Sequence, residues 1–472
     1  MIILHSNDIH GRIEGLARIA TLVDQTRARN AGEPVLYVDL GDIEEPTQRL
    51  SSLTKGVAMH RLLSVAGCEV AAVGNGGPMR YGPQVLPEYA AAARYPLLVA
   101  NLRQPDGTVV PGARTSTLLE IGGVRLGLIG VTADMGGIYD GFGVRTPPVA
   151  PLVRELAAGL RREGADAVIL LSHLGLPEDR TLAGELQQEV RLILGGHTHD
   201  LLPEGERVGE VLIAQAGQYA EHLGRVDLGW DGAKLVTMRA SVLPATQDIP
   251  PAARVLDEAR VIEGEVARFL DAVVGELERP LDFATYRECG MGDLAADVLR
   301  ERMDAEVAVV AAAQAFTGPL AAGPLTRSRL WDVCSSTANP GVVDMTGARL
   351  LDMLRRGLDP AFAAERPRPL RGSERGLLHL AGANIHDGRL FIAEADAERE
   401  VEPARTYRVA ATDWELEPYG GYVEADWAPH PRYDMPTIMR EAVEDYLARH
   451  RPARVELGRI VGALAPRDPE RP

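Results

Sequence analysis

The stretch Ile2-Ile3-Leu4-His5-Ser6-Asn7-Asp8-Ile9-His10-Gly11 joins a short apolar run to a polar turn. A short apolar run bounded by turn residues is typical of a buried strand. Similar runs alternate with helix-like spacing through the first half of the chain. Strands are predicted at 2–4, 35–38, 70–73, 97–99, 126–129, 168–171, 192–194 and 211–214, and helical patterns run from Leu16 to Val23 and from Pro151 to Leu160. This alternation predicts an α/β sandwich with substantial parallel sheet.

Asp, Asn and His residues follow five of these predicted strands. The segments are Asn7-Asp8-Ile9-His10-Gly11, Asp39-Leu40-Gly41-Asp42, Gly74-Asn75, Ser172-His173 and Gly195-Gly196-His197-Thr198-His199-Asp200. Ligands of open α/β sheets bind outside the carboxyl ends of the strands. Each segment alone has an ordinary structural explanation, such as a turn or a hydrogen-bonded histidine. Together and in this order they indicate one site at one edge of the sheets.

The ordered motifs Asn-Asp-Ile-His-Gly, Leu-Gly-Asp, Val-Gly-Asn, Ser-His-Leu-Gly and Gly-Gly-His-Thr-His resemble those of the calcineurin-like metallophosphoesterases. Within these, the chain is similar to the 5′-nucleotidase family, which also covers UDP-sugar hydrolases and 2′,3′-cyclic phosphodiesterases. The resemblance covers residues 1–245 and implies two metal sites. The implied ligands are Asp8, His10 and His199 for one ion, Asn75, His173 and His197 for the other, and Asp42 for both.

The chemistry of such a site is the hydrolysis of phosphate esters. Two divalent cations held close together bind the phosphoryl oxygens and lower the pKa of a bridging water, which gives a hydroxide near neutral pH. Imidazole and carboxylate ligands suit Mn, Zn, Fe, Co or Ni, and the sequence does not choose among these ions. The expected substrate is a small phosphate ester, a nucleotide or a molecule like one. A cyclic-nucleotide or UDP-sugar phosphodiesterase and a metal-binding module without turnover remain alternatives.

The chain departs from the family where the Asn ligand is normally followed by a histidine that assists the leaving group. Here Asn75 is followed by Gly76, which has no side chain. A positioned acid or base contributes ~10²–10⁴-fold to a rate, so another group is needed. Arg80 and Tyr81 lie just beyond, and either is placed to reach the phosphate or the leaving oxygen, with His60 and Glu44 as further candidates. Arg80 is the residue expected to bind the substrate phosphate. The expected catalytic residues are therefore Asp42, Asn75 and Arg80.

A Pro-rich break at 244–251 and an amphipathic helix after it predict a boundary between two domains. We expect a four-layer αββα metallophosphoesterase sandwich over residues 1–245, a helical linker over 246–274 and an α+β substrate-binding domain over 275–472. The second domain lacks the family's phosphate-gripping Arg, since Ala311 to Phe316 occupies that position. Trp414, Tyr419 and Tyr422 lie near the family's base-stacking loop and are the expected substrate-binding residues, because aromatic faces hold bases by π contact.

The composition limits the partners. Lys and Arg total 50 and Asp and Glu total 67, so the net charge is −17. Such a surface repels nucleic-acid polymers and anionic membranes, and neither is expected as a partner. No signal-peptide pattern precedes Asp8 and no apolar run reaches membrane-spanning length, so we expect a cytoplasmic protein. The sequence makes no prediction about the oligomeric state.

Overall fold

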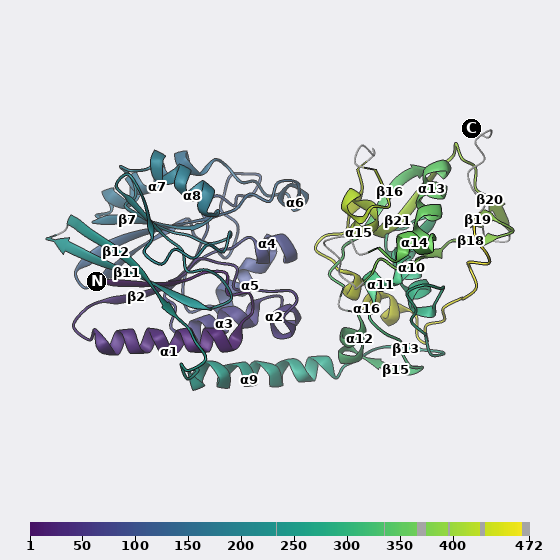
Figure 1. The fold of residues 1–472 in the computed structure, drawn as a ribbon, viewed down its shortest axis with the longest axis horizontal. Coiled ribbons are helices and arrows are strands. Elements are labelled where there is room, and N and C mark those ends of the chain that lie inside the picture. The colour runs from purple at the N-terminus through teal and green to yellow at the C-terminus, as the bar shows by residue number, and fades with distance from the viewer. Residues whose placement is uncertain (233, 335, 366–373, 395–396, 425–429, 465–472) are drawn as a thin grey trace. The chain divides into compact units, whose positions relative to one another are not determined.

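The computed structural model describes residues 1–472 except 233, 335, 366–373, 395–396, 425–429 and 465–472. The chain forms two compact units, Met1–Val266 and Ala267–Pro472, drawn in Figure 1. The division falls inside helix α9 (Ala253–Leu270), between the predicted boundaries at 245 and 275. The predicted roles of the two domains, metal binding in the first and substrate binding in the second, stay predictions.

Two six-stranded sheets form the centre of the first unit. In each sheet four strands run parallel and further strands pair antiparallel beside them. The first sheet has the order β12 (Lys234–Pro244), β11 (His222–Asp231), β1 (Ile2–Ser6), β2 (Val35–Asp39), β3 (Val70–Ala72), β4 (Leu97–Leu98). The second has the order β5 (Ser116–Ile121), β6 (Val124–Thr132), β7 (Ala167–His173), β8 (Leu192–Leu194), β10 (Val211–Ala214), β9 (Glu206–Val208).

Alternating side chains of the strands create the layers. Ile2 and Leu4 of β1 pack with helix residues such as Leu16, whereas Ile3 packs with residues of the second sheet. Strand β7 behaves likewise, because Ile169 enters the core between the sheets and its neighbours on the chain enter an outer core with helices. The helices are α1 (Ile13–Arg29), α2 (Arg49–Leu53), α3 (Val57–Ala66), α4 (Gly76–Tyr81), α5 (Leu86–Ala92), α6 (Gly137–Gly141), α7 (Val149–Arg162) and α8 (Leu176–Glu185). The four-layer αββα prediction is confirmed, and Figure 1 shows the layers.

The long antiparallel hairpin β11–β12 was not predicted. It pairs with β1 along Ile2 to His5 and widens the first sheet. The burial along β11 alternates, with Val226 and Leu228 buried and Asp227 between them half-exposed. A strand with one wet face lacks the continuous apolar run that marks the parallel strands, so a search for such runs passes over it.

The second unit is built on a five-stranded mixed sheet whose two faces are covered by different helices. Alternate residues of β14 (Val307–Ala311) divide between two cores. Ala308 and Val310 face the core with α10 (Gly290–Arg302) and α16 (Met439–Arg449), and Val307 and Val309 face the core with α13 (Gly347–Gly357). The strand order is β17 (Leu378–Ala381), β14 (Val307–Ala311), β21 (Thr406–Thr412), β16 (Pro340–Thr346), β22 (Arg432–Tyr433). The predicted α+β domain is confirmed.

Smaller elements complete this unit. Two further sheets pair β13 (Val273–Leu277) with β15 (Gly323–Thr326) and join β18 (Ala383–His386), β19 (Arg389–Ala393) and β20 (Glu398–Glu400). The helices are α10 (Gly290–Arg302), α11 (Ala312–Ala315), α12 (Arg327–Val333), α13 (Gly347–Gly357), α14 (Pro360–Ala363), α15 (Asp413–Leu416) and α16 (Met439–Arg449). Among the described residues, no helix has the length and apolar character needed to cross a membrane.

Candidate metal centre

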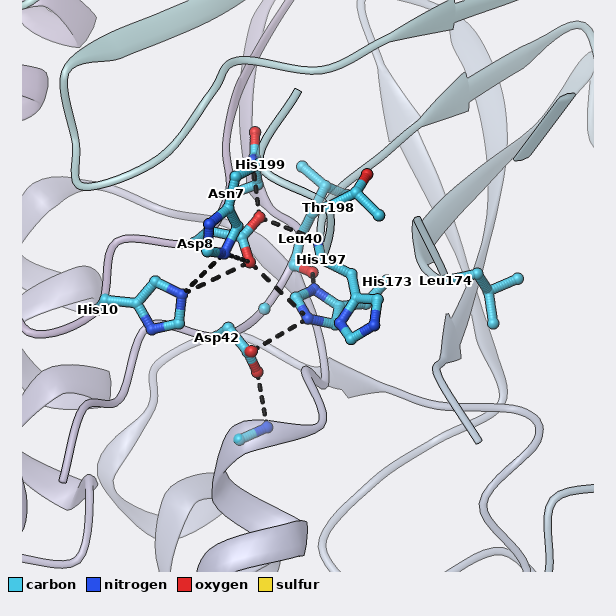
Figure 2. A network of polar contacts seen from close by, with 12 residues as sticks. Asn7, Asp8, His10, Leu40, Asp42, His173, Leu174, His197, Thr198 and His199 are labelled. Atoms are coloured by element: carbon cyan, nitrogen blue, oxygen red, sulfur yellow. Dashed lines mark hydrogen bonds and ion pairs between the residues drawn. The ribbon is translucent and has the colours of Figure 1, made fainter. Parts of the chain in front are cut away.

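The seven predicted ligands all lie where strands of the two sheets end. Strand β1 ends at Ser6, two residues before Asp8, and β2 ends at Asp39, shortly before Asp42. Asn75 follows β3, His173 is the last residue of β7, and the loop after β8 carries the other two histidines. Because parallel strands bring their carboxyl ends to one edge, residues far apart in the sequence meet there (Figure 2).

Asp8, His10 and His199 form the first group, whose ligand atoms lie within 4.8 Å of one another. His10 Nε2 lies 3.1 Å from His199 Nε2, and Asp8 Oδ1 lies 3.3 Å from His199 Nε2. Asp8 Oδ1 also lies 3.8 Å from His10 Nε2. A carboxylate oxygen and two imidazole nitrogens thus converge on one point, which is the donor set that a borderline divalent cation prefers.

Asp42, His173 and His197 form the second group under the same distance limit. His173 Nε2 lies 3.3 Å from Asp42 Oδ2, and the His173 and His197 ring centroids are 5.3 Å apart. Asp8 Oδ1 lies 3.9 Å from His173 Nε2, so the two groups are neighbours. The structure therefore brings together the six acidic and histidine residues that the sequence singled out. That they bind metal, and that Asp42 serves both ions, stays a prediction.

Asn75 adjoins the second group through its neighbour in the chain. The Gly76 N–H donates to Asp42 Oδ1 at 2.7 Å. Asn75 is buried, and its Oδ1 has no hydrogen-bond partner among the described residues. A buried amide oxygen without a partner costs free energy, roughly 1–3 kcal/mol. A cation at this position would remove that cost.

Hydrogen bonds fix each ligand so that one acceptor atom stays available. Asp8 Oδ2 accepts from Asn7 Nδ2 at 2.8 Å and from the His197 N–H at 2.9 Å, while Asp8 Oδ1 accepts no hydrogen bond. His173 Nδ1 donates to the Leu40 carbonyl oxygen at 2.7 Å, which leaves the lone pair of its buried Nε2 for a cation. Asn7 and the Leu40 carbonyl were not predicted as partners, although both lie inside the quoted motifs.

The backbone at the centre is strained. Asp8, His10, Asp42, His197 and His199 all have positive φ angles, between 47° and 76°. Non-glycine residues rarely adopt this left-handed region, and each costs of order 1 kcal/mol or more unless its surroundings enforce it. Ten non-glycine residues of the described chain have positive φ, and five of them are predicted ligands. Strain concentrated in this way marks a functional site rather than ordinary turns.

The charges of the two groups are strongly coupled. Burial acts to lower the pKa of His173, but the carboxylates of Asp42 and Asp8 outweigh it and raise that pKa to about 10. Burial acts to raise the pKa of Asp42, yet His173 and the Gly76 N–H hold it well below its usual range. Two buried carboxylates thus favour a positive charge between them, and a divalent cation supplies such a charge. The donor atoms therefore fit the implied metal ions.

Gly76 and Arg80 lie close to the candidate ligands in the sequence but contribute no side-chain atom to either group. A Cβ at Gly76 would lie 3.0 Å from Asp42 Oδ1, so a side chain here would press on the carboxylate. Arg80 lies in the last turn of α4 and is half-buried. Its role in binding phosphate stays a prediction.

The three aromatic residues predicted to bind substrate differ in exposure. Trp414 is 1% exposed and Tyr422 is 3% exposed, and both belong to a core of the second unit. Tyr419 is 46% exposed, and its ring lies 5.5 Å from that of Trp414. Of the three rings, that of Tyr419 is accessible to solvent, because the other two are buried in the core of the second unit.

Comparisons with known proteins cover both units. Residues 273–425 match the family model described as the C-terminal domain of 5′-nucleotidase. An uncharacterised metallophosphoesterase of Bacillus subtilis is 27% identical, over 87% of this chain and 91% of the relative. A 5′-nucleotidase of Diplobatis ommata is 25% identical, over 63% of this chain and 58% of its own length.

Solved structures share the fold. The NAD nucleotidase of Haemophilus influenzae covers 99% of both chains with a TM-score of 0.61 at 13% identity. A 5′-nucleotidase precursor of Thermus thermophilus covers 99% of this chain and 100% of its own, with a TM-score of 0.55 at 20% identity. Both the motif order of the first unit and the family match of the second therefore agree with one architecture.

Proposed function

We propose that this chain is a hydrolase of the 5′-nucleotidase family of calcineurin-like metallophosphoesterases, and that it removes phosphate from a nucleotide or a nucleotide-like monoester. The observation that carries the proposal is a set of buried acceptor atoms that have no hydrogen-bond partner among the described residues, Asp8 Oδ1, Asn75 Oδ1 and His173 Nε2. Acceptors that converge without donors need a cation, and two cations are what this chemistry uses. The names of the relatives support the choice of a nucleotide.

The proposed ligand sets follow the two groups. One cation would be held by Asp8, His10 and His199, the other by Asn75, His173 and His197, with Asp42 shared. Two divalent cations in such a site supply Lewis acidity toward a phosphoryl oxygen and activate water at neutral pH. Mn, Zn, Fe, Co and Ni all suit these donors, and metal analysis would choose among them.

The chain's own residues orient the site. The Leu40 carbonyl fixes the tautomer of His173 through Nδ1, and Asn7 holds the Asp8 carboxylate. We propose that Arg80, on the helix that begins at Gly76, binds the substrate phosphate. If Arg80→Ala leaves kcat/KM unchanged, Arg80 has no such role.

The test is metal analysis of the purified protein followed by a substrate panel with added Mn²⁺. The panel holds p-nitrophenyl phosphate, its bis ester, nucleoside 5′-monophosphates, 2′,3′-cyclic nucleotides and UDP-glucose. We expect the monoesters to be hydrolysed fastest and Asp42→Asn to abolish turnover. The exposed control Asp106→Asn should behave like the wild type.

Other results would redirect the assignment. Preference for the bis ester, cyclic nucleotides or UDP-glucose would make the protein a phosphodiesterase. Tight metal binding with no turnover of any ester would make it a metal-binding module. The cytoplasmic location expected from the sequence stays a prediction, which cell fractionation would check.

A further inference from the structure

A buried carboxylate that is not a predicted ligand lies directly behind the candidate metal centre. Asp179 of α8 is fully buried, and its Oδ1 accepts a hydrogen bond of 2.5 Å from the Ser172 hydroxyl. Ser172 immediately precedes His173 at the end of β7. The position of Asp179 is thereby tied to the strand end that presents one predicted ligand.

Gln215, which is also fully buried, makes the matching connection on the other side. Its amide fits its surroundings when the oxygen accepts from the backbone N–H groups of His199 and Asp200, at 3.2 and 3.0 Å. In the opposite orientation the oxygen would face only acceptors. Gln215 therefore holds the loop that carries another predicted ligand.

The two side chains meet at Gly195. A Cβ added at Gly195 would lie 2.5 Å from Asp179 Oδ2 and 3.3 Å from the outer atom of the Gln215 amide. Asp179 Oδ2 has no other hydrogen-bond partner among the described residues. With the Gln215 oxygen turned toward the His199 and Asp200 N–H groups, the amide nitrogen takes the position near Gly195, from which it can donate to Asp179. The absence of a side chain at Gly195 is what lets the two groups approach.

We propose that Asp179 and Gln215 form a buried brace that keeps the end of β7 and the His199 loop in register, and so sets the spacing between the two groups of ligands. The inference rests on the proposed metal centre. Both residues act through neighbours, Asp179 through Ser172 and Gln215 through backbone N–H groups, so they are positioning residues. Partners of this kind typically change metal affinity or activity by roughly 10–100-fold when they are lost.

Exchanging the chemistry of the two positions tests the brace. Gln215→Glu places two carboxylates against each other above Gly195, and we expect the Kd for Mn²⁺ to rise by roughly 10–100-fold. The double variant Asp179→Asn/Gln215→Glu returns a donor to face an acceptor, because the amide introduced at 179 can donate to the carboxylate introduced at 215. Its Kd should recover by roughly tenfold or more, a non-additive result that coupled neighbours give.

Several measurements separate positioning from general damage. Titration calorimetry with Mn²⁺ gives the Kd without turnover, and we expect kcat to fall in Gln215→Glu while KM for p-nitrophenyl phosphate changes little. Glu178→Gln, an exposed change on the same helical turn, should match the wild type. If the exchange variants fail to fold, Ser172→Ala provides a further test. It removes the hydrogen bond from Ser172 to Asp179 and should weaken Mn²⁺ binding.

The outcomes distinguish this inference from the proposed function. A wild type that binds Mn²⁺, with Gln215→Glu binding equally well, overturns the brace and leaves the metal centre standing. A double variant as weak as the sum of its single changes also overturns it. A wild type that binds no Mn²⁺ removes the metal centre itself, and the brace with it.

Discussion

Two clusters of buried polar atoms, one in each unit, have no hydrogen-bond partner among the described residues and differ in their chemistry. At the candidate metal centre they are acceptors, namely Asp8 Oδ1, Asn75 Oδ1 and His173 Nε2. Around Tyr422 in the second unit they are donors, namely Tyr422 Oη, Trp414 Nε1 and the Nε and Nη1 of Arg375. Arg375 is buried, lies 4.2 Å from the Phe362 ring centroid and reaches Glu365 at 3.5 Å.

The difference shows how far each region is organised around something else. Acceptors held by hydrogen bonds on their outer atoms, on a strained backbone, describe a place prepared for cations. The donors around Tyr422 instead lie among packed aromatic rings, such as those of Phe362 and Tyr422, whose centroids are 5.2 Å apart. The first region therefore fits the proposed metal centre, whereas the second is held together by packing. Four experiments test this contrast.

The largest expected effect is at the metal centre. Asp8→Asn keeps the size of the side chain, and Asn, like Asp, tolerates positive φ. The substitution removes a charged ligand atom. We expect kcat/KM for p-nitrophenyl phosphate to fall roughly a thousandfold, about 4 kcal/mol, together with the loss of bound metal by elemental analysis. The melting temperature of the metal-free variant should stay close to that of the metal-free wild type. Full activity would remove Asp8 from the ligand set.

In the second unit, truncation of a buried side chain should lower the stability of the fold. Tyr422→Ala opens a cavity in a core, and we expect the free energy of unfolding to drop by about 3–5 kcal/mol. Tyr419→Ala changes an exposed ring and should cost no more than ~1 kcal/mol. Denaturant unfolding of the pair measures the difference. A stable Tyr422→Ala variant with a raised KM for a nucleotide would mean that the ring holds substrate and would erase the contrast.

A third experiment restores the family's histidine. Because a Cβ at Gly76 would lie 3.0 Å from Asp42 Oδ1, we expect Gly76→His to displace the carboxylate and weaken Mn²⁺ binding by roughly tenfold, without a gain in kcat. Gly184→Ala, at a helical glycine with open space around it, is the matched control and should bind Mn²⁺ normally. A rise in kcat would show that the loop yields and that the site lacks only this acid.

The smallest effect concerns pH. Burial raises the pKa of Asp293, in α10 of the second unit, to about 8. A raised pKa favours the protonated folded form, so its contribution to stability is complete below the ordinary Asp pKa of 3.8 and is lost as the pH rises through about 8. We expect Asp293→Asn to gain about 1 kcal/mol over the wild type as the pH rises from about 7 to about 8. Thermal unfolding at both pH values checks this, with the exposed Asp304→Asn as control; equal pH dependence would contradict it.

The sequence predicted the layers and the gathering of ligand residues because both follow from local patterns. A buried parallel strand is a continuous apolar run, and the ligands stand directly after such runs. The brace at Asp179 and Gln215 could not be predicted, because its partners are joined by a close approach over Gly195 and by backbone N–H groups. For Trp414 and Tyr422 the sequence left both a core role and a ligand-binding role open, since an aromatic side chain has the same signature in a core and at a ligand.

The left-handed backbone at five predicted ligands has a consequence for mutational drift. Glycine adopts positive φ without steric cost. In a chain that did not bind metal, replacing any of these five residues by glycine would therefore relax the backbone and raise the stability of the fold. Random change would then erode the set quickly, since loss of each member would be rewarded by a firmer fold. A chain that has all five in this conformation is what the proposed metal centre predicts, because bound cations would offset the strain.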